Sequence, residues 1–200
     1  MAHWLLIAAA SAVLVTPRAQ PLPREVTRHP GETAAAFADR ALDLPGDVDQ
    51  HVTETKWDGR PVVFVDFLRG ADDDEERPVT ALLQQAPGGP YHRLSVTIGE
   101  TEGGAPDLAA LGFANADADS AKELIVILVW RQMHGGGACM PIYEVRILDD
   151  AKPGLVALGQ ISSLKRHFNP ENCRRGSQDG EQFPFKTIAS VKAELKRMGF

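Results

Sequence analysis

Apolar residues recur at helical spacing near both ends of the chain. In residues 32–44 they form one stripe of Ala34, Phe37, Ala41 and Leu44, which Pro45 and Gly46 end. Near the C-terminus a second stripe comprises Ile188, Val191, Leu195 and Met198. Thr187 precedes this stripe and is of a residue type that caps helices. The pattern predicts one amphipathic helix at each end of the chain, each with an apolar face to bury.

Between these helices the apolar positions follow the spacing of strands. Short apolar or alternating runs, separated by Gly, Pro and acidic residues, occupy 61–68, 79–84, 91–98, 124–130, 142–148 and 155–161. The run 124–130 is apolar throughout, which is typical of a central strand buried on both faces. The last three runs follow one another closely, which indicates an antiparallel meander. The fold class we expect is α+β, with a mostly antiparallel sheet of about five to seven strands covered by the N-terminal and the C-terminal helix.

The N-terminal segment has the pattern of a secretory signal. Trp4 to Val15 is an almost unbroken apolar run, shorter than the roughly 20 residues that a membrane-spanning helix needs. We therefore expect residues 1–19 to be a signal peptide and the mature protein to be periplasmic or secreted. Residues 20–31 contain prolines without periodicity and predict an extended linker, and residues 32–200 predict a single globular domain. The alternative for the first segment is a short buried N-terminal helix.

The two cysteines of the chain, Cys139 and Cys173, fit an oxidising compartment. Both lie in segments rich in turn residues, and an even number of cysteines in an exported protein predicts a disulfide between them. The alternatives are free thiols or a copper site. Met133, His134, Cys139 and Met140 would supply the soft ligands that copper favours.

Composition narrows the class of partner. The chain of 200 residues is 44% hydrophobic, enough for a sizeable core, and its formal net charge is −6. This acidic balance argues against a nucleic-acid partner, because proteins that bind nucleic acids usually present a basic face. After the leader, no apolar run is long enough to span a membrane. We expect a protein or the cell envelope as the partner.

One loop has the residue spacing of a cation site. Oxygen-bearing side chains occur at alternate positions in Asn115, Asp117, Asp119 and, after the backbone carbonyl of Ala121, in Glu123. A curled loop turns every second side chain inward, and calcium takes roughly six to eight oxygen ligands. The sequence therefore offers a calcium site in residues 115–123. The alternative is an ion-free turn that Asx hydrogen bonds hold in the same shape.

This loop and the apolar run after it resemble the calcium loops of FG-GAP repeats of integrin-type propellers, whose consensus is Asp-x-Asp-x-Asp-Gly-x-x-Asp-Leu. The resemblance implies a calcium site with the ligands named above, and it occurs once in the chain. Asn115 and Glu123 stand where the family has Asp, and Ala118 and Ser120 stand in place of its glycines.

The order of the elements is also similar to that of a broad group of exported bacterial proteins of unassigned function. These have an N-terminal helix, a strand that contains a tryptophan, here Trp57, and a final helix that ends in glycine and an aromatic residue, here Gly199 and Phe200. That resemblance implies a fold and an exported location, and no activity.

The chain lacks common catalytic signatures such as Gly-x-Ser-x-Gly. His51 with Glu54 and Asp66, or His167 with Glu171, are candidate acid–base pairs. The absence of a motif favours a protein without catalytic activity. An unrecognised hydrolase stays open as a third hypothesis, because catalytic geometry is spatial.

Two further hypotheses come before the hydrolase. The first is an exported, non-enzymatic domain that acts through protein or cell-envelope contacts. In its inhibitor- or immunity-like version, the acidic loops at 72–76 and 117–119 would cover a basic cleft. The alternative is a calcium- or small-ligand-binding module that uses the 115–123 loop.

Overall fold

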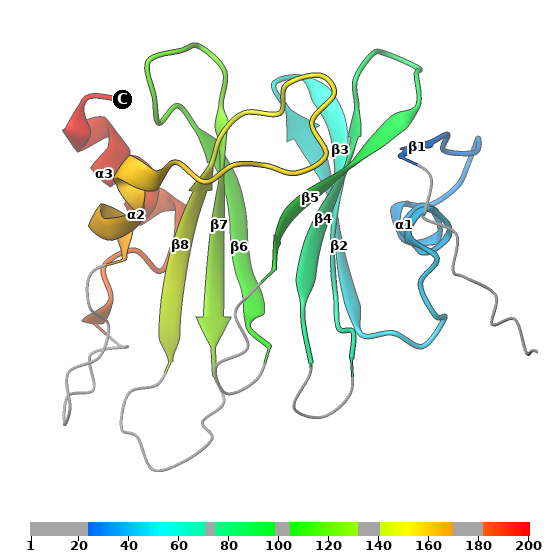
Figure 1. Ribbon diagram of the computed structural model, residues 1–200, viewed down its shortest axis with the longest axis horizontal. Coiled ribbons are helices and arrows are strands. Elements are labelled where there is room, and N and C mark those ends of the chain that lie inside the picture. The colour runs from blue at the N-terminus through cyan, green and yellow to red at the C-terminus, as the bar shows by residue number, and fades with distance from the viewer. Residues whose placement is uncertain (1–23, 71–74, 99–104, 132–140, 170–181) are drawn as a thin grey trace, which may run out of the picture.

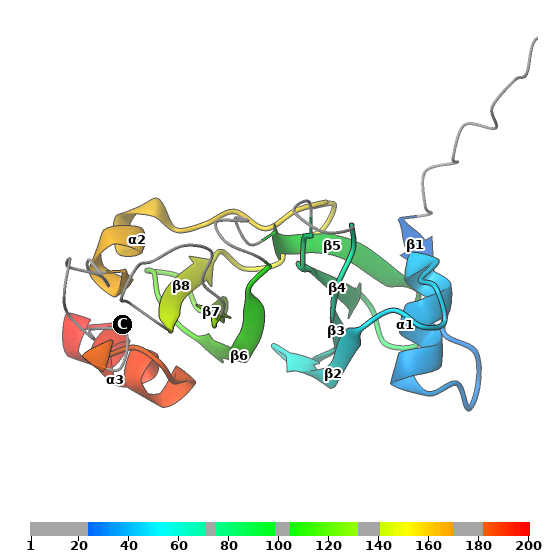
Figure 2. The same cartoon turned by 90° about the horizontal axis from the view of Figure 1, so that it is seen from below.

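The computed structural model describes residues 24–70, 75–98, 105–131, 141–169 and 182–200 (Figure 1). Their elements are β1 (Glu25–Val26), α1 (Ala34–Leu42), β2 (Gln50–Trp57), β3 (Arg60–Phe67), β4 (Pro78–Gln84), β5 (Tyr91–Ile98), β6 (Asp107–Ala114), β7 (Glu123–Trp130), β8 (Ile142–Leu148), α2 (Ser162–Phe168) and α3 (Ile188–Met198). The layers follow one another as α1, the sheet that contains β2 to β5, the sheet of β6 to β8, and then α2 with α3. Figure 2 shows the same order in a view turned by 90°.

The described strands form two antiparallel sheets. One has five strands in the order β1-β5-β4-β3-β2, and the other has three in the order β6-β7-β8. The prediction of a mostly antiparallel α+β fold is confirmed. The expectation of one sheet is wrong, because the strands divide into two sheets that pack face to face. All eight residues of β7 are buried, since this strand packs on the other sheet with one face and on helices with the other.

Three hydrophobic clusters hold these layers together. The cluster between the sheets contains Trp57, Phe64 and Leu83 from the larger sheet and Leu124 and Val126 from the smaller one. The N-terminal helix α1 packs on the outer face of the five-stranded sheet. Helices α2 and α3 cover the outer face of the three-stranded sheet. The terminal helices thus cover opposite outer faces of the sandwich, as Figure 1 shows, and not one shared sheet.

The predicted terminal helices are present, with ends fixed by caps. Thr33 accepts a hydrogen bond from the Ala36 N–H (3.2 Å), so α1 begins at Ala34, the first residue of the predicted apolar stripe. It ends at Asp43, whose φ of 53° is left-handed. Thr187 caps α3 by accepting from the Ser190 N–H at 3.1 Å, as predicted.

The predicted strand at 155–161 is wrong. This segment crosses from one sheet to the other and makes isolated bridges to each. In β5, the Ser95 N–H donates to the Val156 carbonyl and the Ser95 carbonyl accepts from the Leu158 N–H, both at 2.9 Å. On the other sheet, the Asp149 N–H donates to the Gly159 carbonyl at 2.8 Å. A segment shared between two sheets in this way builds a continuous ladder with neither.

Within the segment expected to be an extended linker, Glu25 and Val26 form β1 at the edge of the larger sheet, opposite His92 and Tyr91. Among the described residues, no helix is long and apolar enough to cross a membrane.

Candidate functional site

The loop between β6 and β7 is curled by consecutive Asx turns. The Asp117 N–H donates to Asn115 Oδ1 at 3.2 Å, and the Asp119 N–H donates to Asp117 Oδ1 at 2.8 Å. The Ala121 N–H repeats this contact with Asp119 Oδ1, again at 2.8 Å. The Asn115 amide nitrogen in turn donates to the Asp119 carbonyl at 2.7 Å. The alternation of side chains in the sequence therefore produces a loop wound on itself.

This winding brings Asp117, Asp119 and Glu123 together. One carboxylate oxygen from each lies within 4.8 Å of the other two. Both ends of the Asn115 amide are engaged within the loop. Ala121 takes part through its N–H, so the predicted role of its carbonyl oxygen stays a prediction. The structure thus assembles the acidic part of the predicted ligand set.

Glu123 is the unusual member of this cluster, because its exposed fraction is 0%. Its Oε2 accepts from the Ala116 N–H, which closes the loop. Its Oε1 is also buried and accepts no hydrogen bond from the described part of the chain. A buried carboxylate is stable only when it is paired or hydrogen-bonded, since desolvation of the charge is costly. Glu123 Oε1 is therefore a buried acceptor without a hydrogen-bond donor or cation among the described residues.

The surroundings of Glu123 also change its protonation. The pKa of this carboxyl is raised from 4.5 to about 7, mainly by burial and in smaller part by the charges of Asp117 and Asp119. The hydrogen bond from Ala116 acts in the opposite direction. Near neutral pH the cluster is thus short of positive charge, which either a proton or a metal cation supplies.

The turn between β2 and β3 holds the end of this loop. Trp57 Nε1–H donates to the Lys122 carbonyl at 2.6 Å, and the Lys122 N–H donates to Asp58 Oδ2 at 3.1 Å. Both segments lie at the same end of the sandwich in Figure 1. Asp58 and Gly59 have φ of 47° and 79°, the positive values of a tight hairpin turn. The Asp58-Gly59 dipeptide predicts such a turn, but no sequence signal indicates its contact with Lys122.

Of the two acids proposed to act with His51, only Asp66 lies beside it among the described contacts. His51 Nδ1 lies 3.2 Å from Asp66 Oδ1, whereas Glu54 pairs with Arg28 at 2.5 Å. Arg77 Nη1 lies 2.8 Å from the same Asp66 oxygen. Asp66 and Arg77 are buried, and the His51 side chain is 69% exposed. Arg77 thus neutralises the buried Asp66, and His51 lies at the rim of a structural ion pair.

The other proposed histidine pair falls partly outside the described residues. His167 Nε2 lies 2.5 Å from Glu194 Oε1, so α2 and α3 are joined there. Glu171, Cys139, Cys173 and the copper ligands Met133, His134 and Met140 lie outside the described residues, as do Asp72 to Asp74 and the leader at 1–19. The disulfide, the copper site and the signal peptide stay predictions.

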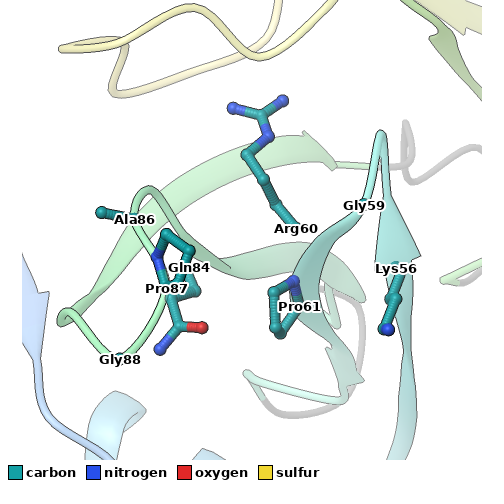
Figure 3. Close-up of a pocket in the computed structure, with 8 residues that line it drawn as sticks. All are labelled: Lys56, Gly59, Arg60, Pro61, Gln84, Ala86, Pro87 and Gly88. Carbon is teal, nitrogen blue, oxygen red and sulfur yellow. The ribbon is translucent and has the colours of Figure 1, made fainter.

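A surface pocket of about 270 Å³ lies beside the β2–β3 and β4–β5 turns (Figure 3). It is lined by Lys56, Gly59, Arg60, Pro61, Gln84, Ala86, Pro87 and Gly88. Arg60 points away from Lys56 in Figure 3 and donates to the Ala151 carbonyl at 3.1 Å. The two basic side chains of the pocket, Lys56 and Arg60, therefore do not converge on a common ligand position.

The strongest candidate in the described part of the chain is thus the carboxylate cluster of the 115–123 loop. The likeness of this loop to FG-GAP repeats stays a resemblance of short motifs. Comparisons of the chain with protein-family models, with curated proteins and with solved structures find no match.

Proposed function

We propose that the protein is a calcium-binding module whose site is the 115–123 loop. Asp117, Asp119 and Glu123 supply the charged ligands. One observation carries the proposal: Glu123 is wholly buried, has an oxygen without a hydrogen bond among the described residues, and lies within 4.8 Å of two other carboxylates. A cation at this position would pair the buried charge and remove the repulsion among the three acids.

The donor chemistry favours calcium over other common metals. All side-chain donors of the cluster are carboxylate oxygens, which suit hard cations, whereas zinc prefers nitrogen and sulfur ligands. Magnesium demands near-ideal octahedral geometry, while calcium accepts irregular sets of roughly six to eight oxygens. An irregular loop between two strands fits the second requirement. Water and backbone carbonyls, including that of Ala121, would complete the coordination.

The contact hypothesis uses the same loop in another way. In an inhibitor- or immunity-like protein, exposed acids face the basic cleft of a partner. Asp119 is exposed and accessible to such a partner, but Glu123 is not. A buried acid adds nothing to a protein contact and costs stability, so its presence favours the cation. Export and envelope contacts remain proposals that are compatible with calcium binding.

Calorimetric titration of the metal-free full chain with calcium tests the proposal. We expect heat for one site per chain in the wild type and none in Glu123→Gln, which keeps the size and the acceptor for Ala116 but removes the charge. Asp107→Asn is the matched control, because Asp107 is an exposed acid at the start of β6 and pairs with Arg131 at 3.2 Å. Wild-type protein that gives no heat at about millimolar calcium would refute the calcium site.

A further inference from the structure

The backbone of Lys122 is held on both sides by the β2–β3 hairpin. Its carbonyl accepts from Trp57 Nε1–H at 2.6 Å, and its N–H donates to Asp58 Oδ2 at 3.1 Å. Lys122 directly precedes Glu123, the buried member of the carboxylate cluster. Two hydrogen bonds on one peptide segment fix both its position and its orientation. The hairpin therefore fixes the position of the backbone at Glu123.

The hairpin is itself a rigid support. Trp57 is fully buried, and its ring stacks on that of Phe113 with centroids 5.5 Å apart. Phe64 adds a second aromatic contact to Trp57 at 6.5 Å. Phe113 belongs to β6 in the smaller sheet, whereas Trp57 and Phe64 belong to the larger one. The support for Lys122 is thus built into the core between the sheets.

Asp58 combines two requirements at one position. Its φ of 47° lies in the left-handed region, which Asp and Asn tolerate better than other residues that have a side chain. Its carboxylate also accepts the Lys122 N–H. An alanine meets neither requirement, whereas an asparagine keeps the turn and an acceptor oxygen.

We infer that Trp57 and Asp58 are positioning residues of the cation site, and that an occupied site in turn holds the hairpin of the opposite sheet. This inference rests on the calcium site proposed above. The hairpin fixes the peptide next to Glu123, so loosening it moves a ligand. Coupling between two equilibria is reciprocal. If an ordered hairpin strengthens calcium binding, bound calcium also stabilises the ordered hairpin.

The first test compares calcium affinities of full-length variants. Asp58→Ala is expected to weaken calcium binding about five- to tenfold, the lower range of measured couplings between sites. Asp58→Asn is expected to bind close to wild type. Trp57→Phe keeps an aromatic ring but removes the N–H donor, and it too is expected to bind more weakly. Trp130→Phe is the control, because Trp130 lies at the other end of β7.

The second test follows the hairpin itself by NMR. Calcium is expected to shift the indole N–H resonance of Trp57 and to slow amide exchange at Lys122, while the indole resonance of Trp130 stays unchanged. In metal-free protein, Asp58→Ala is expected to speed exchange at Lys122. A purely structural role would lower the melting temperature of Asp58→Ala and leave calcium affinity unchanged.

The outcomes separate the two proposals. Wild-type protein that binds calcium, together with Asp58→Ala of equal affinity and an unshifted Trp57 resonance, would overturn the positioning role and leave the calcium site standing. Wild-type protein that binds no calcium would overturn both. If Trp57→Phe fails to fold, the two Asp58 variants decide the question alone.

Discussion

The Glu123 carboxylate accepts the backbone N–H of Ala116, seven residues earlier, and so closes the loop on a side chain with no solvent exposure. A carboxylate in this position serves as a loop acceptor and carries a charge that the fold does not neutralise. The first role needs only an oxygen. The second role imposes a cost that a proton or a cation removes.

Glu123→Gln separates these roles. The amide keeps an acceptor for Ala116 and removes the charge, so the metal-free variant is expected to be more stable than wild type by about 1–3 kcal/mol at pH 8. Urea unfolding in the presence of a chelator measures the difference. A variant less stable than wild type would show that the charge already has a partner within the fold.

The raised pKa of Glu123 predicts a pH dependence of stability. The folded-state pKa of about 7 lies above the ordinary value of 4.5, so between these values the native state holds a proton that the unfolded chain has lost. The stabilisation is full below pH 4.5 and falls as pH rises through 7, by about 3 kcal/mol in total. The metal-free wild type should lose more stability between pH 5 and pH 8 than Glu123→Gln does. Equal slopes would contradict the raised pKa.

The buried pair of Arg77 and Asp66 predicts a loss of stability without a loss of calcium binding. Arg77→Met removes the buried arginine beside Asp66, which is 2% exposed and keeps the solvent-exposed His51 as a neighbour, and is expected to cost about 3–5 kcal/mol. Adding Asp66→Asn should recover part of this loss. The pair lies at the end of β3 opposite the hairpin, so calorimetry should give wild-type calcium affinity at temperatures where the variant is folded. Weaker calcium binding there would contradict the assignment of this pair as structural.

Gly112 lies where α3 meets β6. A methyl group there would overlap the Ile188 side chain, so Gly112→Ala is expected to destabilise the protein by about 1–3 kcal/mol. Gly46→Ala is the control, because that position has open space around it. Unfolding by urea compares the two variants. Equal stabilities would mean that α3 shifts without cost.

Local patterns were sufficient to predict the two terminal helices and the acidic residues of the site, but not α2. Thr187 precedes a stripe at helical spacing, and it caps α3 as expected. Asp117, Asp119 and Glu123 come together because a loop with acids at alternate positions curls on its own Asx turns. These features depend on neighbours in sequence, which is why the residues themselves indicate them.

Features that depend on distant segments were not predictable. No apolar alternation marks strand β2, because Thr53 and Thr55 are exposed at the edge of a sheet, and only the resemblance to exported proteins indicated a strand at Trp57. Trp57 and Lys122 are 65 positions apart and belong to opposite sides of the sandwich. Glu123, at the start of an apolar run, has the pattern of an exposed strand end. Its burial comes from the packing of the folded chain around it, which the local pattern does not show.

The measurement that tests the central claim most directly is terbium luminescence excited through tryptophan. Terbium takes oxygen ligands as calcium does. The Trp57 indole donates a hydrogen bond to the carbonyl of Lys122, the residue before Glu123, so a bound ion would lie close to this fluorophore. The predicted result is sensitised emission from wild-type protein that calcium abolishes, with none from Glu123→Gln. Equal emission from both proteins, or emission that calcium does not displace, would contradict a calcium site at residues 115–123.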